Sequence, residues 1–244
     1  MDRQLISALA HVDHPVAAPL TGESVRRLLD HAIRRGDERL LDLGCGGAAW
    51  LIHALAAHPR VTAEGVDVSA PALARAEKTA TGVRDRLVLH QRDATEYTSA
   101  DPFDVVLSVG ASYIFGGLLP TLRAASEHLA PGGHVLVGDG FWEHPPSPDA
   151  VEMLGDLDDL ATIVDRVTGD GWTPVYGHIS TREELDDYEW SWTGSLASWA
   201  LDHPGDPDSA EALMVASTHR DEWLGTYRTS FGFVTLVLRG PNAV

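Results

Sequence analysis

The sequence predicts an α/β fold in which helices cover both faces of one mostly parallel sheet of seven strands. From Arg39 onward, short apolar runs alternate with stretches of helical spacing, which is the pattern of β-α units. Runs such as VVLSV (105–109) and HVLVG (134–138) are apolar at nearly every position, as in parallel strands covered on both faces. The stretches between these runs are long enough for the crossovers that parallel pairing requires.

The elements expected before Gly140 follow in chain order. Residues 1–37 are expected to be helical, because TGESVRRLLDHAIRRG (21–36) has apolar residues at helical spacing and stops at a glycine. Five strands are expected at RLLDLG (39–44), VTAEGVDV (61–68), RLVLHQRDA (86–94), FDVVLSVG (103–110) and GGHVLVGDG (132–140). The helices expected between them are AAWLIHALAAH (48–58), PALARAEKTA (71–80) and LLPTLRAASEHLA (118–130).

After Gly140 the chain becomes acidic and aromatic. We expect an acidic helix at 153–167, a strand at WTPVYGHIS (172–180), a helix rich in Trp and Tyr at 184–201, and one further acidic helix. The last run, FGFVTLVLR (231–239), is apolar on both faces and is therefore expected in the middle of the sheet rather than at its edge.

Charge and cysteine content exclude several classes of function. The net charge is −18, and the stretch from Asp139 to Arg228 holds 20 acids against 4 arginines. Such a field repels phosphate backbones, so no nucleic-acid partner is expected, although the acids also serve simply to keep a surface hydrated. A single cysteine, Cys45, permits neither an internal disulfide nor a thiolate zinc cluster and fits a reducing cytoplasm. No apolar stretch approaches 18 residues, and no membrane partner is expected.

The most informative string is RLLDLGCGGAAW (39–50), a strand that runs into a glycine-rich turn and then a helix. Gly44 and Gly46 let the backbone pass close to a ligand, and the helix N-terminus offers free N–H groups to an anionic group. With Ala49 these glycines also satisfy the dinucleotide fingerprint G-x-G-x-x-A, so the pattern alone does not exclude a nicotinamide cofactor. Asp42, an acid two residues before the first glycine, favours a cationic ligand instead.

At this point the chain resembles the class I S-adenosylmethionine-dependent methyltransferases, of the small-molecule, bacterial type. The resemblance rests on D-x-G-C-G-G, on the acid of GVDVS (65–69), on RDA (92–94), on FDVVLSVGA (103–111) and on LAPGGHVLV (129–137). These five strings cover about residues 38–140 in order. The resemblance implies a Rossmann-like fold whose last strand is antiparallel, S-adenosyl-L-methionine as cofactor, and a helical cap formed by the N-terminus and late insertions.

The resemblance also implies a role for each cofactor residue. Asp67, 23 residues after Gly44, would accept the two ribose hydroxyl protons. Asp93 and the Ala94 backbone would hold the adenine edge, and Val68 and Ser69 would line the base. Asp42 and the backbone of Gly44, Cys45 and Gly46 would face the methionine end, with Ser108 and Val109 closing the floor.

The acceptor side is less constrained. Because methyl transfer is a direct displacement, the protein mainly has to align the acceptor, and a base is needed only for acceptors that hold their proton tightly. Candidate bases occur in three places: His11 and His14 near the N-terminus, Asp139 with Glu143 and His144 after the fifth strand, and Tyr188 with Glu189 in the aromatic stretch. Of these, His14, Glu143 and His144 are the candidate catalytic residues. The side chains expected to bind the acceptor are His11, Tyr113, Phe141, Trp142, Tyr188 and Trp192; Trp190 could join this aromatic group, and Trp192 also has core spacing.

The expected organisation is a single domain: an N-terminal cap (1–37), a cofactor-binding core (38–140), an acceptor-binding and cap region (141–230) and a final strand (231–239). The expected function is methyl transfer to an oxygen or nitrogen of a small-molecule acceptor, with S-adenosyl-L-homocysteine as product. A homodimer is a possible oligomeric state. Two alternatives remain: a protein that binds the cofactor without methyl transfer, and an NAD(P)-dependent oxidoreductase, which lacks the Tyr-x-x-x-Lys pair here. No metal site is expected, because no H-E-x-x-H occurs.

Overall fold

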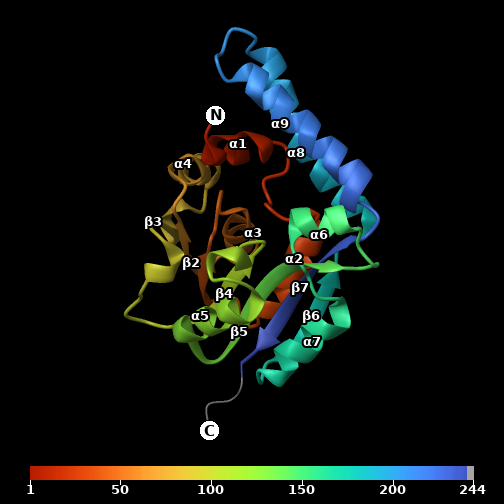
Figure 1. Ribbon diagram of the computed structural model, residues 1–244. Coiled ribbons are helices and arrows are strands. Elements are labelled where there is room, and N and C mark those ends of the chain that lie inside the picture. The colour runs from red at the N-terminus through yellow and green to blue at the C-terminus, as the bar shows by residue number, and fades with distance from the viewer. Residues whose placement is uncertain (241–244) are drawn as a thin grey trace.

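One sheet of seven strands forms the centre of the molecule, which the computed structural model describes for residues 1–240 (Figure 1). The strands are β1 Arg39–Leu43, β2 Thr62–Asp67, β3 Leu87–Gln91, β4 Phe103–Val109, β5 Leu129–Trp142, β6 Thr173–Ile179 and β7 Phe231–Arg239. Their spatial order is β3-β2-β1-β4-β5-β7-β6. Only β7 is antiparallel to its neighbours, and it lies between β5 and β6. The predicted mostly parallel, Rossmann-like sheet with an inner antiparallel last strand is thus confirmed.

Nine α-helices surround the sheet in the described part of the chain. They are α1 Arg3–Ala10, α2 Gly22–Ala32, α3 Ala49–Ala57, α4 Ala70–Thr79, α5 Leu118–His128, α6 Pro148–Leu154, α7 Leu160–Gly169, α8 Arg182–Asp202 and α9 Ser209–Glu222. Three short 3-10 turns, at Arg84–Arg86, Ala94–Glu96 and Ser112–Ile114, and a π-helical turn, Trp223–Tyr227, complete the helical elements.

Alternating side chains of the strands bury two apolar layers. In β4, Val105 and Leu107 join the layer beneath α2, α3 and α4, whereas Val106 joins the layer beneath α5 and α7. Because successive strand residues point to opposite faces, one run of apolar residues fills both layers. This explains why these strands have no polar alternation in the sequence.

The segment after β5 differs in detail from the sequence expectation. The acidic stretch 153–167 was expected to be one helix, but α6 ends before Gly155, whose φ of +89° is left-handed, and Asp159 then caps α7 through its contact with the Thr162 N–H. Strand β5 also continues past Gly140 to Trp142, because residues 140–142 pair with β7. Both differences come from backbone geometry that apolar spacing does not report.

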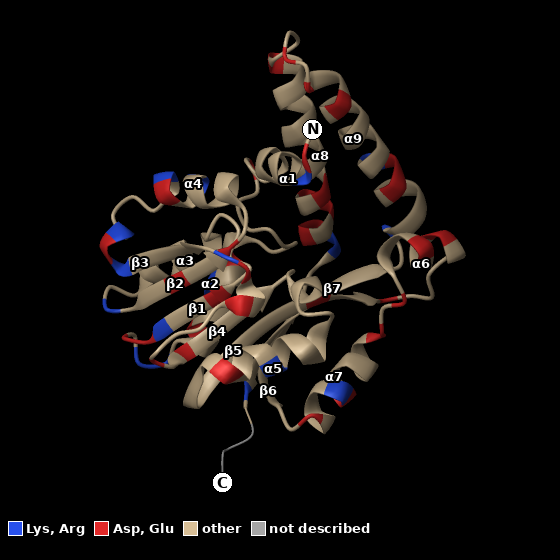
Figure 2. Cartoon of the chain, turned by 60° about the vertical axis from the view of Figure 1, so that its left-hand side comes forward, with Lys and Arg blue, Asp and Glu red and all other residues tan. Residues whose placement is uncertain are grey.

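A helical cap stands over the end of the sheet where β1, β2 and β4 finish. Helices α8 and α9 form an antiparallel hairpin that projects from the body, and α1 packs between this hairpin and α4 (Figure 1). Leu196, Ala200, Ala212 and Ala216 form the apolar seam of the hairpin, and Ile6 of α1 packs against it. Acidic side chains predominate on α6, α8 and α9 (Figure 2).

Candidate active site

The glycine-rich turn after β1 is held tightly against β2. The N–H groups of Gly44 and Cys45 both donate to the Val66 carbonyl oxygen, at 2.9 and 3.0 Å. Gly44 has a φ of +87°, and a Cβ on it would lie 2.9 Å from the side chains of Ala111 and Ile114. Gly46 is also left-handed, at +52°, and a Cβ there would meet no atom within 4 Å. The turn therefore needs glycine for close packing on one side and presents bare backbone to open space on the other.

Two carboxylates lie near this turn, one at the end of β2 and one next to the end of β1. Asp67, at the end of β2, accepts hydrogen bonds from the Gly46 and Ser69 N–H groups, both at 2.8 Å. Asp42, in β1, is 3% exposed and accepts no hydrogen bond from any residue in 1–240. Burial, together with the neighbouring charge of Asp67, raises the pKa of Asp42 to about 8. A cationic group beside Asp42 would stabilise its ionised form.

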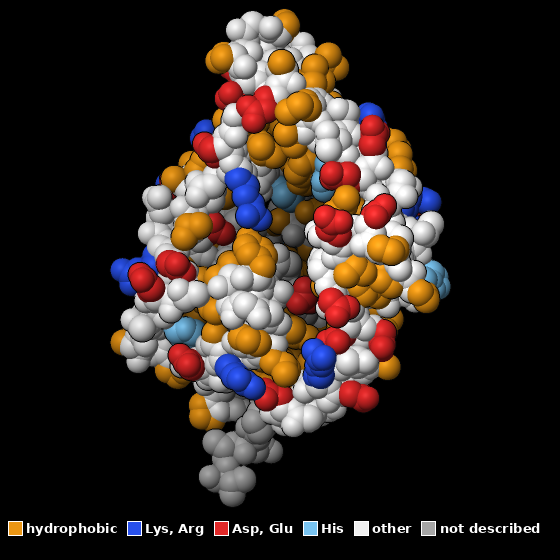
Figure 3. Space-filling model, in the orientation of Figure 1, with side chains coloured by type: hydrophobic (Ala, Val, Ile, Leu, Met, Phe, Trp, Pro, Cys, Tyr) orange, Lys and Arg blue, Asp and Glu red, His pale blue; other side chains and the backbone are white. Residues whose placement is uncertain are grey.

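A cavity of about 370 Å³ opens over this turn, between the sheet edge and helix α1. Its floor comes from the glycine turn, from the residues that follow β2 and from the end of β4. Its roof is the side of α1 that carries Ser7 and Ala8. In the space-filling view a deep hollow lies on this face below the cap, with histidine side chains visible in its upper part (Figure 3).

Six of the predicted cofactor residues line this cavity: Gly44, Gly46, Asp67, Val68, Ser69 and Val109. The other five do not, and each has a local explanation. Asp93 is exposed and binds the N–H and hydroxyl of Thr95, both at 2.8 Å, while Ala94 beside it is buried. The buried hydroxyl of Ser108 donates to the Leu43 carbonyl at 3.1 Å. Asp42, as described above, lies in β1 below the turn.

Cys45 is the fifth residue that does not line the cavity. Its side chain fills the space over Gly65, where a Cβ would lie 2.8 Å from the sulfur. Burial raises the pKa of the Cys45 thiol well above its usual value, so the side chain remains a neutral packing group.

Arg75, on α4, is a lining residue that the sequence analysis did not single out. Its guanidinium donates to the Ala8 carbonyl at 2.6 Å and lies beside Gly47, so it joins the roof to the turn. Burial lowers the pKa of this guanidinium. Ala72 and Arg75 both line the cavity and are three residues apart on α4, a spacing that would have indicated a shared helix face.

His11 connects the cavity to the cap. The ring of His11 lines the cavity, and its Nδ1 lies 2.7 Å from the Ser7 carbonyl oxygen, which only accepts. The neutral ring therefore carries its proton on Nδ1, and Nε2 accepts from the Tyr188 hydroxyl at 3.0 Å. Burial lowers the pKa of His11. His14 packs edge-on against the same tyrosine, with ring centroids 5.3 Å apart, so α8 gathers both histidines of the N-terminal segment.

Among the remaining acceptor-side candidates, Tyr113 alone in residues 1–240 lines this cavity, and it is 69% exposed. Glu143 instead forms an ion pair with Arg182 at 2.9 Å, and the exposed His144 follows it after the end of β5. Phe141 and Trp142 are buried in apolar clusters, and Trp192 stacks on His219 in the cap, at a centroid distance of 4.2 Å. Their assignment as acceptor-binding residues remains a prediction.

Residues 1–240 contain no group of three or more His, Cys, Asp or Glu side chains arranged to hold a metal ion. Within the same part of the chain, no helix is both long and apolar enough to cross a membrane.

Comparison with known proteins gives consistent results. Residues 41–135 match the family model described as a methyltransferase domain. The chain is 26% identical to the uncharacterised protein YjhP of Escherichia coli (strain K12), over 98% of this chain and 99% of YjhP. A SAM-dependent methyltransferase from Geobacter sulfurreducens, solved in complex with S-adenosyl-L-homocysteine, matches with a TM-score of 0.89 and 25% identity, over 96% of this chain and 97% of that one. A SAM-dependent methyltransferase from Thiobacillus denitrificans, also in complex with S-adenosyl-L-homocysteine, matches with a TM-score of 0.88 and 26% identity, over 98% of this chain and 99% of that one.

Proposed function

We propose that this chain, which is a class I S-adenosylmethionine-dependent methyltransferase, transfers a methyl group to an oxygen or nitrogen atom of a small-molecule acceptor by direct in-line displacement. The observation that carries the proposal is the pair of carboxylates, Asp42 and Asp67, on either side of a glycine turn that faces one cavity. When bound, S-adenosylmethionine supplies a methyl group that its sulfonium has already activated.

The donor set of the cavity fits this cofactor. Each oxygen of Asp67 accepts one backbone N–H and keeps a lone pair, so the carboxylate can also accept the two ribose hydroxyls. Asp42 lacks a partner in residues 1–240, and the ammonium group of the methionine end would supply one. The exposed backbone at Gly46 leaves room for the chain of the ligand between these two acids. Val68 and Ser69, beside Asp93 and Ala94, would border the adenine.

The residues above the turn would border the reactive end of the cofactor. His11 lies in the cavity roof and contacts Tyr188, and Tyr113 also lines the cavity, with the Arg3 guanidinium of α1 over its ring. In this proposal, residues 38–140 hold the cofactor, and α1 with the α8–α9 hairpin closes over it. The acid-rich second half favours a small acceptor that carries no phosphate.

Isothermal titration calorimetry with S-adenosylhomocysteine, and separately with NADH, tests this proposal. We expect the wild-type protein to bind S-adenosylhomocysteine and not NADH. Asp67→Ala should weaken that binding by roughly 1–3 kcal/mol, because two hydroxyl donors lose their acceptor. Asp85→Ala, which removes an exposed acid far from the turn, is the matched control and should bind like the wild type.

Each alternative has its own outcome. Binding of NADH without S-adenosylhomocysteine would replace this proposal with the oxidoreductase. If S-adenosylhomocysteine binds but no methylated product forms from S-adenosylmethionine across amine, alcohol, phenol and carboxylate acceptors, the protein is a cofactor-binding protein without methyl transfer.

A further inference from the structure

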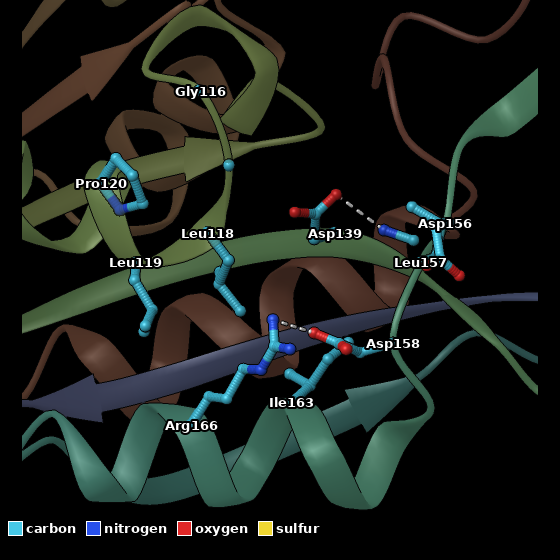
Figure 4. A pocket seen from close by; sticks show the side chains of 12 residues that line it. Gly116, Leu118, Leu119, Pro120, Asp139, Asp156, Leu157, Asp158, Ile163 and Arg166 are labelled. Carbon is cyan, nitrogen blue, oxygen red and sulfur yellow. Dashed lines mark hydrogen bonds and ion pairs between the residues drawn. The ribbon is translucent and has the colours of Figure 1, made fainter.

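A second cavity, of about 300 Å³, lies at the ends of β4 and β5 on the side of the sheet that α5 and α7 cover. Asp139 of β5 lines it, and Val137 and Phe141, two residues to either side, point to the same face. In Figure 4 the Asp139 carboxylate projects into the space between the loop that carries Gly116 and the segment that carries Asp156. The cavity therefore has a carboxylate at its inner wall.

This cavity and the cofactor cavity flank one loop, residues 110–117. The beginning of the loop, at Gly110 and Ala111, lines the cofactor cavity, and its end, at Gly116 and Gly117, lines the second cavity. The N–H of Gly110, a residue of the cofactor cavity wall, donates to the Gly138 carbonyl at 2.9 Å. Asp139 is the next residue after Gly138 on the adjacent strand β5, so it lies close to that wall. An acceptor in the second cavity thus lies beyond the β4 end of the cofactor cavity, on the side of β5.

The charges around the second cavity are incompletely balanced. Within residues 1–240, Arg166 is the only base that lines it, and this arginine is paired with Asp158 at 2.6 Å. Asp139 is half-buried and Asp156 is exposed, and neither forms an ion pair within residues 1–240. Asp139 accepts a hydrogen bond from the adjacent Gly140 N–H at 2.9 Å, and the nearby Ser112 hydroxyl helps to lower its pKa, but neither donor carries a charge. A half-buried carboxylate without a cation is costly, and a cationic ligand would relieve that cost.

The rest of the wall is apolar. Leu118 and Leu119 of α5, Leu157 before α7 and Ile163 of α7 face the cavity around the carboxylate. An apolar pocket with one convergent charge is the usual form of a small-molecule site. The lining thus suits a ligand with an apolar body and one positive end.

We infer that this second cavity binds the methyl acceptor and that the acceptor is an amine, whose ammonium group pairs with Asp139 while its apolar part lies against Leu118, Leu157 and Ile163. This inference rests on the proposed function and narrows its acceptor from oxygen or nitrogen to nitrogen. An ammonium has no lone pair, so a proton must leave before the nitrogen can attack. The N–H bond breaks, an O–H bond forms on Asp139, and the neutral amine keeps the electron pair.

The electrostatics of Asp139 agree with this role. Burial raises the pKa of the Asp139 carboxyl, and the Ser112 hydroxyl and Gly140 N–H only partly oppose the rise. A carboxylate with a raised pKa is a better proton acceptor near neutral pH than one in water.

Binding of benzylamine and benzyl alcohol, two probes of similar shape, tests the inference without knowledge of the true acceptor. Ligand-observed NMR titrations would use the protein saturated with S-adenosylhomocysteine. We expect the wild type to bind benzylamine in preference to the alcohol. Asp139→Asn should weaken benzylamine binding by on the order of tenfold and leave benzyl alcohol unchanged. Asp165→Asn, which neutralises an exposed acid of α7 that does not line the cavity, is the control and should change either affinity by less than about twofold.

Equal binding of the two probes to the wild type, or benzylamine binding that survives Asp139→Asn, would overturn the inference. Methyl-group chemical shifts of Leu118, Leu157 and Ile163 in the wild type locate the probe even if Asp139→Asn fails to fold, and unchanged shifts would also overturn it. The proposed function fails separately, through loss of S-adenosylhomocysteine binding. In that case the benzylamine titration on the cofactor-free protein still decides whether the second cavity takes an amine.

Discussion

The two walls of the cofactor cavity are constructed differently. On the sheet side, backbone groups of adjacent strands hold the glycine turn, and the contacts of Gly44 with Val66 and of Gly46 with Asp67 join residues 21 or 22 positions apart. On the cap side, side chains join segments far apart in sequence, as in the contact of His11 with Tyr188, 177 residues away. The pairing of β1 with β2 is enough to form the sheet wall, whereas the cap wall also requires particular side chains. Cofactor affinity and cap stability should therefore respond to different mutations.

Glu184 is the clearest case on the cap side. This carboxylate, 5% exposed, sits where the first turns of α2 and α8 meet. It accepts hydrogen bonds from the Thr21 N–H, the Ser24 hydroxyl and the Thr181 N–H, at 3.0, 2.6 and 2.9 Å. These contacts hold the pKa of Glu184 at about 2, although burial alone would raise it. One side chain thus fastens the cap to the body.

The largest effect is expected on the sheet side, from Gly44→Ala. The new Cβ would need a left-handed backbone and would lie 2.9 Å from Ala111 and Ile114, so we expect the free energy of unfolding to fall by about 2–4 kcal/mol. Binding of S-adenosylhomocysteine should be lost in calorimetry, because the turn must shift to relieve the contact.

Gly36→Ala is the control for this prediction. Gly36 has a similar φ of +79° but no atom within 4 Å of the added Cβ, so only the conformational strain, about 1 kcal/mol, should appear. Equal loss of S-adenosylhomocysteine binding in both variants would show that close packing of Gly44 in the sheet wall is not what binding depends on.

A smaller effect, confined to stability, is expected from Glu184→Gln. The amide keeps the shape but turns an acceptor of several N–H and O–H donors into a partial donor, so urea denaturation at pH 7 should show a loss of about 2 kcal/mol. Affinity for S-adenosylhomocysteine should stay within about threefold of the wild type, because Glu184 does not line the cofactor cavity.

The sign of the pH dependence sharpens this test. Folding lowers the pKa of Glu184. The contribution of its carboxylate to the free energy of unfolding is therefore complete above the pKa of an unfolded glutamate, about 4.3, and is lost as pH falls towards 2. The difference in stability between wild type and Glu184→Gln should shrink over that window. Glu183, the exposed neighbour, provides the control: the stability of Glu183→Gln should equal that of the wild type at every pH.

The smallest effect concerns Asp42. Its raised pKa, about 8, leaves the carboxyl mostly protonated at pH 6.5–7.5, whereas pairing with an ammonium requires the ionised form. Binding of S-adenosylhomocysteine should therefore release a proton and tighten with rising pH, by at most about tenfold per unit. His11, the histidine in the cavity, has a lowered pKa and contributes little in this window.

Calorimetry in buffers of different ionisation enthalpy measures the released proton. Asp42→Asn should abolish the release and flatten the pH dependence. The unliganded protein should also lose stability from about pH 4 to pH 8, since its folded state keeps a proton on Asp42 that the unfolded chain gives up. A wild-type affinity that falls with pH over 6.5–7.5 would contradict the placement of an ammonium at Asp42.

The same contrast decides what the sequence can predict. The glycine turn and the strand ends at Asp42 and Asp67 are predictable, because turn chemistry and apolar runs depend on neighbouring residues. The roof contact of Arg75 with Ala8 and the placement of His11 against Tyr188 depend on how α1 and α8 dock, which local spacing does not encode.

Phe141 and Trp142 illustrate the limit most clearly. Both residues follow the predicted end of their strand and therefore looked available to an acceptor. Pairing with β7 extends β5 over them and buries both side chains. The left-handed Gly155 divides the expected acidic helix in two. This break could not be predicted from the sequence pattern, because the apolar spacing continues across Gly155.

The most direct test of the central claim is a crystal structure of this protein with S-adenosylhomocysteine. We expect the ligand in the cavity under α1, with both ribose hydroxyls within hydrogen-bond distance of Asp67 and the ammonium group directed towards Asp42. A ligand bound elsewhere, or bound there with its ribose away from Asp67, would contradict the account.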